Sequence, residues 1–348
     1  MSRETTQQNA LSASAVAGHY LGADAPSSFG DPAGELKALQ SGCGIFDLGW
    51  RAQITAGGND RIRWLHNMVT NNVRDLKLNR GNYDFVLNAQ GRILGDLYIF
   101  NRGDFLLLET DRAQVETLLT TLKRFIIMDK VELAADSTRS GVGMCGPKAQ
   151  ELLSGAGADV AGMEPLEVRD SNVFGITAVI IRGPEQKPFW YELWTDGGQA
   201  ASLLEKLANC GAQVVGSEAL EAWRVLHGIP QYGQDIRERD LPQETEQSQA
   251  LNFNKGCYIG QEIVERIRSR GQVHRKFTGF EFDGPVSPGK HEAEGRVLAE
   301  VTTAIGVPTS AGQKYIGLGY VRREAVPSGT AVEINGINAR VVDLPFQI

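Results

Sequence analysis

Residues 254–262 read Asn-Lys-Gly-Cys-Tyr-Ile-Gly-Gln-Glu, and this stretch decides how the rest of the chain is interpreted. It places Cys257 close to Lys255 and directly before Tyr258, with a glycine on either side. A cation near a thiol favours the thiolate, which is the form that attacks electrophiles and binds metals. Glycine permits backbone angles and close approaches that a Cβ atom would block. From the residues alone, Cys257 is either an activated thiolate or a small buried hydrophobe.

The string Lys-Gly-Cys-Tyr-Ile-Gly-Gln-Glu resembles the signature of the YgfZ family, folate-binding proteins related to the aminomethyltransferase (T-protein) of glycine cleavage. The resemblance implies binding of tetrahydrofolate, or of a one-carbon-loaded folate, in support of iron–sulfur cluster assembly or repair. Iron–sulfur proteins or cluster carriers would be its partners. The resemblance also implies a catalytic Cys257, with Lys255 and Tyr258 contacting the folate. The thiolate would bind iron transiently, exchange with a partner disulfide, or be a structural relic.

The length and composition indicate a globular protein of several domains. A chain of 348 residues is too long for one ordinary core, so two or three domains are expected. Its hydrophobic content of 42% and charged content of 22% are typical of soluble globular proteins. The formal net charge of −7 argues against a general nucleic-acid-coating protein, although it leaves room for a local basic patch.

Cysteine usage and hydropathy indicate the cellular compartment. The four cysteines lie far apart and show no metal-type spacing, so we expect neither a disulfide framework nor a metal site. A reducing cytosol fits this usage best. Residues 11–18 are neither basic nor apolar enough for a signal peptide, and no stretch is long enough to span a membrane. We therefore expect a cytoplasmic protein.

Alternating strand and helix patterns predict an α+β fold. The glycine-punctuated run at residues 41–49 is expected to form strand and turn rather than a long helix, and 233–250 a long exposed functional loop. Asp111 and Gln114 have capping-box spacing before a helix. Strand–helix passages over 51–135 indicate a ferredoxin-like α+β domain, and 141–226 echo them. After residue 273, short strands and a hairpin signal at Asn335-Gly336 predict a small β-barrel.

The resemblance implies an aminomethyltransferase (GcvT)-like folate-binding fold, with two ferredoxin-like α+β domains and a C-terminal β-barrel around a central opening. Domain 1 would be discontinuous and folate-binding. The expected boundaries are 1–50 plus 136–272 for domain 1, 51–135 for domain 2 and 273–348 for the barrel.

Asp96 lies in Gly91-Arg92-Ile93-Leu94-Gly95-Asp96-Leu97, near the start of a predicted strand. A solvated carboxylate at a strand edge is the ordinary interpretation. Aminomethyltransferases carry Gly-x-x-x-Asp-Asp-Leu here, and the resemblance implies an acid beside the reactive folate nitrogens. Such a carboxylate would hold a positively charged amine or move a proton. Gly95 replaces the first acid of the pair, and this departure counts against methylene transfer.

Glu192 lies in the aromatic-rich strand Phe189–Trp194. A carboxylate among aromatic rings suits a pterin, which stacks on the rings and donates its 2-amino and N3–H groups to the acid. The T-protein pattern aligns its folate-binding glutamate with Glu192. The alternative is that the tryptophans are core and Glu192 faces solvent by alternation.

Arg224 matches an arginine in a family helix, so the resemblance implies pairing with a folate carboxylate or with Glu192. An exposed helical arginine is the alternative. Tyr83 and Asn88 match the strand that leads into the acidic motif and would hydrogen-bond the cofactor. Turn chemistry or packing explains them equally well.

Arg266, Arg268 and Arg270 alternate and, if the chain is extended there, form a cationic stripe. The stripe is a solvated face, a site for the polyglutamate tail of folate, or a dock for an acidic partner.

Three hypotheses for function follow. The first is a folate-binding YgfZ-type protein, and the second is an aminomethyltransferase that acts on a lipoyl-bound aminomethyl group. The third is an interaction scaffold that binds no folate. Asp96 favours the second hypothesis, whereas Gly95 and the cysteine motif oppose it, so whether one-carbon transfer is catalysed stays open. We expect Cys257 to alkylate faster than the other cysteines.

Overall fold

The computed structural model describes residues 14–184, 189–271, 273–293, 295–309, 312–324 and 326–347. The chain divides into two compact units. The first unit holds the described residues of Met1–Leu65, Asn72–Tyr83 and Leu97–Leu220, and the second those of His66–Asn71, Asp84–Asp96 and Glu221–Ile348. The three-domain division expected from the sequence stays a prediction.

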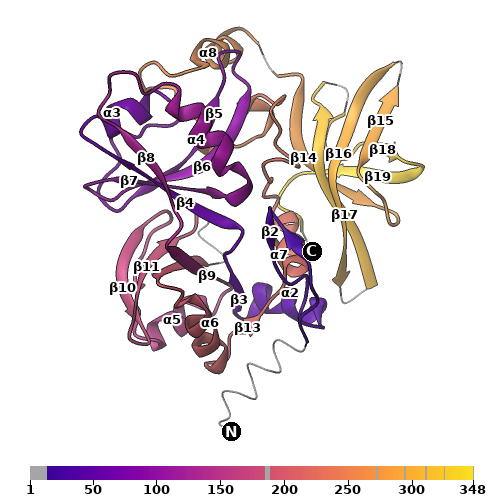
Figure 1. Cartoon of the computed structure of the whole chain (residues 1–348). Helices are drawn as coiled ribbons and strands as arrows, with labels where there is room; N and C mark the ends of the chain where they lie inside the picture. The colour runs from indigo at the N-terminus through magenta and orange to yellow at the C-terminus, as the bar shows by residue number, and fades with distance from the viewer. Residues whose placement is uncertain are drawn as a thin grey trace. The chain divides into compact units, whose positions relative to one another are not determined.

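A six-stranded sheet with the order β10-β11-β12-β9-β3-β13 forms much of the first unit (Figure 1). Apolar side chains of its central strands pack with helices α5 and α6 into one core. The strands are β3 (Gly44–Asp47), β9 (Arg139–Cys145), β10 (Val168–Val173), β11 (Ile176–Arg182), β12 (Trp190–Asp196) and β13 (Gln213–Val214). The helices α5, α6 and α7 span Ala149–Gly155, Ala200–Asn209 and Ser217–Leu226.

The strand expected in the glycine-punctuated run at residues 41–49 is confirmed as β3, and it follows a helix, α2 (Pro32–Ser41), for which no prediction was made. The Asp31 side chain accepts a hydrogen bond from the Gly34 backbone N–H at 2.9 Å, and Pro32 occupies the first turn. Both features favour helix initiation. Leu36 and Leu39 on its buried face supply the apolar anchor. Before α2, a short hairpin joins β1 (His19–Tyr20) and β2 (Ala23–Asp24).

A five-stranded sheet has the order β5-β6-β7-β4-β8. Asp111, at the end of β7, does not cap the following turn, so the capping-box prediction was wrong. Its carboxylate binds Arg51 instead, at 2.7 Å. The strands are β4 (Arg51–Gly57), β5 (Gly81–Leu87), β6 (Ile93–Asn101), β7 (Leu106–Asp111) and β8 (Glu132–Asp136), with α3 (Arg61–His66), η1 (Arg112–Gln114) and α4 (Val115–Lys123) between them.

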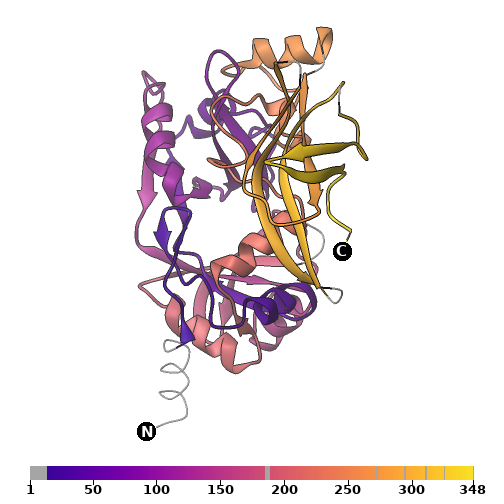
Figure 2. The same cartoon turned by 90° about the vertical axis from the view of Figure 1, so that its right-hand side faces the viewer.

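The C-terminal sheet, in the second unit, has the order β15-β16-β17-β14-β19-β18. The two edge strands of this sheet, β15 and β18, approach each other. The His291 ring Nδ1 on β15 lies 3.0 Å from the Glu333 carbonyl oxygen on β18. The sheet therefore nearly closes on itself, as expected for a barrel, and Figure 2 shows its long strands β16 and β17 side by side. The strands are β14 (Arg275–Phe282), β15 (Gly289–Ala293), β16 (Arg296–Thr309), β17 (Gly312–Arg322), β18 (Ala331–Ile334) and β19 (Ile337–Val342).

The predicted hairpin at Asn335-Gly336 is confirmed. Ile334 pairs with Ile337, and the two residues between them have φ of 52° and 81°. These positive φ values define the two-residue turn that Asn-Gly favours. The barrel core beneath it contains Phe280 and Val341, both fully buried.

Two sequence expectations for the second unit were wrong. Residues 233–250 are not an exposed loop, since Asp235, Ile236 and Thr245 are fully buried there. Two short 3₁₀ turns, η2 (Pro242–Glu244) and η3 (Ser248–Ala250), divide this segment. Residues 266–270 lie in helix α8 (Gln261–Arg270) and are not extended, so the predicted alternation does not place Arg266 and Arg268 on one face. Among the described residues, no helix is long and apolar enough to cross a membrane.

Candidate functional site

In the first unit, Glu192 belongs to a buried cluster of charged side chains centred on Arg51. The Arg51 guanidinium donates from Nε to Glu109 at 3.0 Å and from Nη1 to Asp111 at 2.7 Å. Its Nε also lies 4.0 Å from Oε1 of Glu192. Glu192 is 6% exposed, so the alternative in which it faces solvent was wrong. We call Arg51, Glu109, Asp111 and Glu192 the Arg51 cluster.

Strand register places a carboxamide next to the Arg51 cluster. Gln53 pairs with Glu109 across β4 and β7, as Arg51 pairs with Asp111. Directly paired residues share a face of a sheet, so Gln53 and Arg51 point the same way. Gln53 is 1% exposed, and neither of its amide atoms has a hydrogen-bond partner among the described residues. A buried polar group without a partner costs free energy, and a ligand is one of the reasons for keeping it.

Aromatic side chains surround the same carboxylates. The indole N–H groups of Trp190 and Trp194 donate to the two oxygens of Glu192 at 3.2 Å and 3.0 Å. The Arg51 guanidinium lies over the Tyr98 ring at 6.0 Å, and this ring lies 5.0 Å from that of Tyr83. Tyr83 and Glu192, both predicted site residues, are therefore linked through Tyr98 and Arg51. A cofactor contact for Tyr83 stays a prediction.

The pKa values of Glu109 and Arg51 in this cluster differ from their usual values. Burial raises the pKa of Glu109 well above its usual range, with Arg51 opposing the shift and Glu192 adding to it. Burial works against the charge on Arg51, but its three acidic neighbours together raise the pKa of Arg51 well above its usual value. The arginine thus stays cationic while Glu109 retains its proton to higher pH than an ordinary glutamate.

An aromatic cavity of about 320 Å³ also lies in the first unit. Its lining includes Tyr20, Phe29, Phe46 and Trp50. Phe46 connects it with the Arg51 cluster, since its ring lies 4.9 Å from that of Trp190. The Trp50 indole N–H has no partner among the described residues. A cavity of this size and lining is typical of small-molecule sites.

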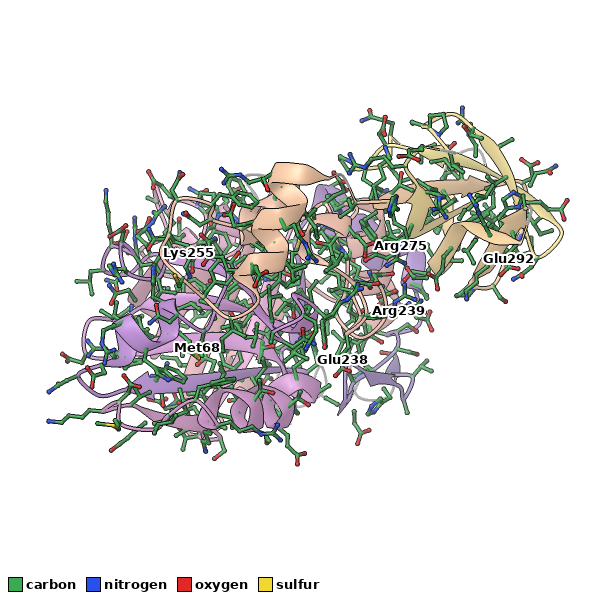
Figure 3. All side chains as sticks on the ribbon, turned by 90° about the horizontal axis from the view of Figure 1, so that it is seen from above. Met68, Glu238, Arg239, Lys255, Arg275 and Glu292 are labelled. Carbon is green, nitrogen blue, oxygen red and sulfur yellow. The ribbon has the colours of Figure 1, made fainter. Side chains whose placement is uncertain are left out.

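In the second unit, Lys255 is a buried cation held by backbone carbonyl groups. Its ammonium donates to His66 O at 2.5 Å and to Val69 O and Asn71 O at 2.6 Å each. It also lies 4.9 Å from the centre of the Tyr258 ring. Figure 3 labels Lys255 together with Met68, which belongs to the segment that supplies these carbonyls. We call this arrangement the Lys255 cage.

The Lys255 cage affects how Lys255 and Cys257 of residues 254–262 are interpreted. The Lys255 ammonium is engaged by the carbonyls, so it does not act as an unpaired cation beside the thiol. Cys257 itself is exposed, which excludes the buried-hydrophobe alternative. A catalytic Cys257 and folate contacts of Lys255 and Tyr258 stay predictions.

A buried carboxyl group lies beside the cage. Asp84 is fully buried and accepts a hydrogen bond from the Asn71 backbone N–H at 2.7 Å. Burial raises the pKa of Asp84 to about 7, although the Asn71 N–H and the charge of Lys255 oppose the shift. This group therefore titrates in the neutral range.

Asn88 forms the turn that receives the second glycine of the signature. Its side-chain Oδ1 accepts from the backbone N–H groups of Gln90 and Arg92 at 2.9 Å and 3.0 Å. Gly260 has φ of 83°, and a Cβ there would meet the Asn88 carbonyl oxygen at 2.6 Å. Gly260 is thus required for packing, whereas a Cβ at Gly256 would meet open space. Turn formation accounts for Asn88, and its contact with a cofactor stays a prediction.

Arg224 and Asp96 also lie in the second unit. The Arg224 guanidinium is buried and binds Asp235 at 2.7 Å and Glu221 at 2.5 Å, so the exposed-arginine alternative was wrong. Asp96 is half-buried on β6. It lies near Tyr232, whose pKa is raised by burial and by the charges of Glu238, Asp96 and Asp240. Folate contacts of Arg224 and Asp96 stay predictions.

The model of the family described as "GCVT N-terminal domain" matches residues 7–255. The chain belongs to this family. It is similar to the aminomethyltransferase of Thermoanaerobacter pseudethanolicus, with 27% identity over 326 residues, covering 90% of this chain and 88% of the relative. The aminomethyltransferase of Bacillus subtilis is 25% identical over 344 residues, with 94% of each chain covered. A putative chloroplastic transferase of Arabidopsis thaliana is 24% identical over 329 residues, with 92% and 74% covered.

A solved structure shows the same fold. The crystal structure of glycine cleavage system aminomethyltransferase T from Bartonella henselae matches with a TM-score of 0.85 and 20% identity, covering 98% of this chain and 96% of that one. The predicted aminomethyltransferase (GcvT)-like α+β fold is therefore confirmed. The specific YgfZ resemblance is not shown by these comparisons, which establish the wider family.

The sequence analysis missed Arg51, Gln53 and Glu109. Each lies on a strand within residues 51–135, where strand–helix passages were predicted, and the signal was present in the alternation. Arg51 and Gln53 occupy alternate positions of β4 beside the apolar Ala52 and Ile54, and Glu109 and Asp111 alternate on β7 after three leucines. Polar residues that recur on one face of a buried strand indicate a polar interior surface.

Proposed function

We propose that this protein binds tetrahydrofolate and acts as an aminomethyltransferase on an aminomethyl group held by a lipoyl-bearing carrier protein. Family membership and relatives named aminomethyltransferase support the reaction class. The observation that carries the proposal is that the Arg51 cluster, with the buried carboxylate of Glu192 among aromatic rings, lies beside the unpartnered carboxamide of Gln53.

The chemistry of these side chains fits a pterin. The 2-amino and N3–H groups of a pterin donate hydrogen bonds, and a carboxylate such as Glu192 has about four lone-pair sites, of which the two indoles use two. A carboxamide both donates and accepts, so Gln53 complements the adjacent carbonyl and N–H edge of the ring. Aromatic rings supply a stacking surface for the flat heterocycle.

Three residues of the Arg51 cluster, Glu192, Arg51 and Glu109, have separate tasks in this proposal. Glu192 orients the pterin, and Arg51 fixes Glu192 while compensating its charge. Glu109 keeps its proton to higher pH than an ordinary glutamate and so limits the buried negative charge. Tetrahydrofolate, when bound, supplies the nitrogens that receive the one-carbon unit. Asp96 would hold a positively charged amine or accept a proton at those nitrogens.

Folate-dependent ammonia release from an aminomethylated lipoyl carrier tests the transferase. The wild type should release ammonia, and Asp96→Asn should lower kcat by about a hundredfold, since positioned proton transfer contributes 10²–10⁴-fold. Cys257→Ala should leave turnover unchanged. Folate binding without ammonia release would contradict aminomethyl transfer while leaving the folate site intact.

A second function is favoured by the Cys257 stretch. Cys257 is exposed, and its flanking residues are anchored by the Lys255 cage and by Gly260. Gly95 also replaces the acid that precedes Asp96 in aminomethyltransferases. These features favour a YgfZ-type protein that binds folate and supports iron–sulfur cluster assembly or repair. Its partners would be iron–sulfur proteins or cluster carriers in the cytoplasm, where free cysteines such as these persist.

Complementation separates the two functions. A strain lacking the gene would carry either the wild type or Cys257→Ala, and the activities of several iron–sulfur enzymes would be measured. Rescue by the wild type that is lost in Cys257→Ala, together with no ammonia release, supports the YgfZ-type function. Equal rescue by both variants, or none by either, counts against it.

A further inference from the structure

A cavity of about 230 Å³ lies against one face of the C-terminal sheet. A water molecule takes about 30 Å³ of liquid volume, so the cavity has room for a small polyanion. Its charged lining residues are the cations Arg239, Arg275, Lys290 and Arg322 and the single carboxylate Glu300. Figure 3 labels Arg239 and Arg275 at the sheet.

Strand register shows that these side chains share one face. Lys290 pairs with Glu300 across β15 and β16, and Glu300 pairs with Tyr320 across β16 and β17. Arg275 pairs with Arg322 across β14 and β17. The Arg275 guanidinium lies 4.8 Å from the Tyr320 ring centre and 3.6 Å from Glu300. Both rows therefore project from the same side of the sheet.

The single lining carboxylate is already neutralised. Arg237 binds both oxygens of Glu300, at 3.0 Å and 3.2 Å, and Arg239 adds a third bond at 2.7 Å. Arg275 is compensated separately by Asp240 and Glu244, at 2.8 Å each. Accordingly the pKa of Glu300 is lowered, because these arginines outweigh the effect of its burial.

Two cations remain without a counter-charge. Lys290 and Arg322 have no ion pair or hydrogen bond from their side chains to any residue in the described part of the chain. Arg322 moreover stands directly opposite another arginine, Arg275. Like charges directly opposite each other destabilise a sheet, and the chain as a whole carries a net charge of −7. A cationic surface of this kind is stabilised when an anion occupies it.

We propose that this cavity binds the phosphate or carboxylate groups of a small polyanionic ligand, with Lys290 and Arg322 as the direct contacts. Arg239 and Arg275 widen the positive field, and their own ion pairs hold them in place. Charge-assisted hydrogen bonds from arginine and lysine are the strong contacts of such sites. The two proposals rest on different residues, so either can fail without the other.

Calorimetric titration of the full chain with inorganic pyrophosphate and with citrate tests the proposal at low salt. At least one anion should bind saturably to the wild type. The double variant Lys290→Gln/Arg322→Gln should bind it at least about tenfold more weakly, since two charge-assisted contacts are lost. Lys276→Gln is the matched control, because Lys276 follows Arg275 on β14 and points to the opposite face. Its affinity should change less than about twofold.

The two anions also distinguish the ligand chemistry. Binding of pyrophosphate alone assigns the site to phosphate groups, and binding of citrate alone assigns it to carboxylates. The single variant Lys290→Gln, at an exposed position, replaces the double variant if the latter unfolds. No saturable binding of either anion, or equal weakening in Lys276→Gln and the cavity variants, would overturn the proposal.

Discussion

Arg51 and Lys255 are both buried cations, yet they are compensated in different ways. Arg51 faces the ionisable carboxyl groups of Glu109, Asp111 and Glu192, beside the unpartnered Gln53. Lys255 faces the neutral carbonyls of a backbone segment. Each cation has a carboxyl group of raised pKa near it, Glu109 for Arg51 and Asp84 for Lys255, but only the first arrangement lies beside an unpartnered carboxamide. The second is saturated by fixed dipoles.

The difference separates a binding site from a structural clasp. A buried polar group without a partner costs free energy, and a ligand that hydrogen-bonds to it regains that free energy. An ammonium group whose N–H groups all have acceptors cannot make further hydrogen bonds. We therefore assign ligand recognition to the Arg51 cluster and the positioning of residues 254–260 to the Lys255 cage. The predictions below test this division.

Arg51→Met should have the largest effect on stability. Removing the guanidinium leaves buried carboxylates without a counter-charge, which costs about 3–5 kcal/mol. Urea denaturation at pH 7 measures the loss. The loss should shrink toward pH 4, because protonation removes the uncompensated negative charge. Arg63→Met is the control, since Arg63 also contacts two carboxylates but is 60% exposed. A loss below about 1 kcal/mol, as expected for a surface pair, would contradict the cluster.

Lys255→Met should cost somewhat less, about 3 kcal/mol, because three buried carbonyl groups lose a charged donor. The same denaturation experiment measures it, with the exposed Lys290→Met as the control. If the cage positions the signature, proteolysis within residues 254–260 should also become faster than in the wild type. Unchanged stability and unchanged cleavage together would show that the ammonium does not anchor this stretch.

Asp84 should make stability depend on pH in the opposite sense to an ordinary carboxylate. Its pKa is raised to about 7, so the folded state keeps a proton that the unfolded state loses above about pH 4. This stabilising contribution is full below pH 4 and is lost as the pH rises to about 7, by at most about 1.4 kcal/mol per unit of pH. Asp84→Asn lacks this dependence, so its stability relative to the wild type should rise over that range. If the difference in stability between Asp84→Asn and the wild type stayed constant over this pH range, the pKa of the Asp84 carboxyl group would be near its ordinary value.

The smallest expected effect concerns the reactivity of Cys257. It distinguishes a Lys255 that activates this thiol from a Lys255 whose ammonium is held by backbone carbonyls. Burial raises the pKa of Cys43 to about 12 and that of Cys145 well above its usual value, whereas Cys210 and Cys257 are exposed. Alkylation at pH 7 followed by mass spectrometry should label the two buried thiols at least about a hundredfold more slowly. With the Lys255 ammonium engaged, Cys257 and Cys210 should react within about threefold of each other. A much faster Cys257 would support the activated thiolate.

Local patterns predicted most of the fold. Alternation and turn residues located β4 to β7 and the C-terminal strands, and Asn335-Gly336 fixed a hairpin that the structure reproduces. Helix α2 was missed although Asp31 and Pro32 carry an ordinary helix-start signal. Residues 233–250 were misjudged because their polar side chains indicate solvent. Their burial depends on partners distant in the sequence, such as Thr303 for Asp235.

The candidate site was only partly predictable for the same reason. Glu192 and Tyr83 were found through aromatic context and resemblance. Arg51, Gln53 and Glu109 meet through strand register, which pairs residues more than 50 positions apart. Lys255 was expected to act on its neighbour in sequence, but its long side chain reaches carbonyls near residue 70 instead. Sequence distance is a poor guide to the partner of a buried charge.

The dissociation constant of tetrahydrofolate for Gln53→Met, measured beside the wild type, tests the central claim most directly. Methionine has a similar size and removes an unpartnered buried amide, so the free energy of unfolding should stay equal or rise by about 1 kcal/mol. Folate binding should nevertheless weaken at least about tenfold, because the pterin loses its carboxamide partner. An unchanged dissociation constant in this folded variant would contradict a folate site at the Arg51 cluster.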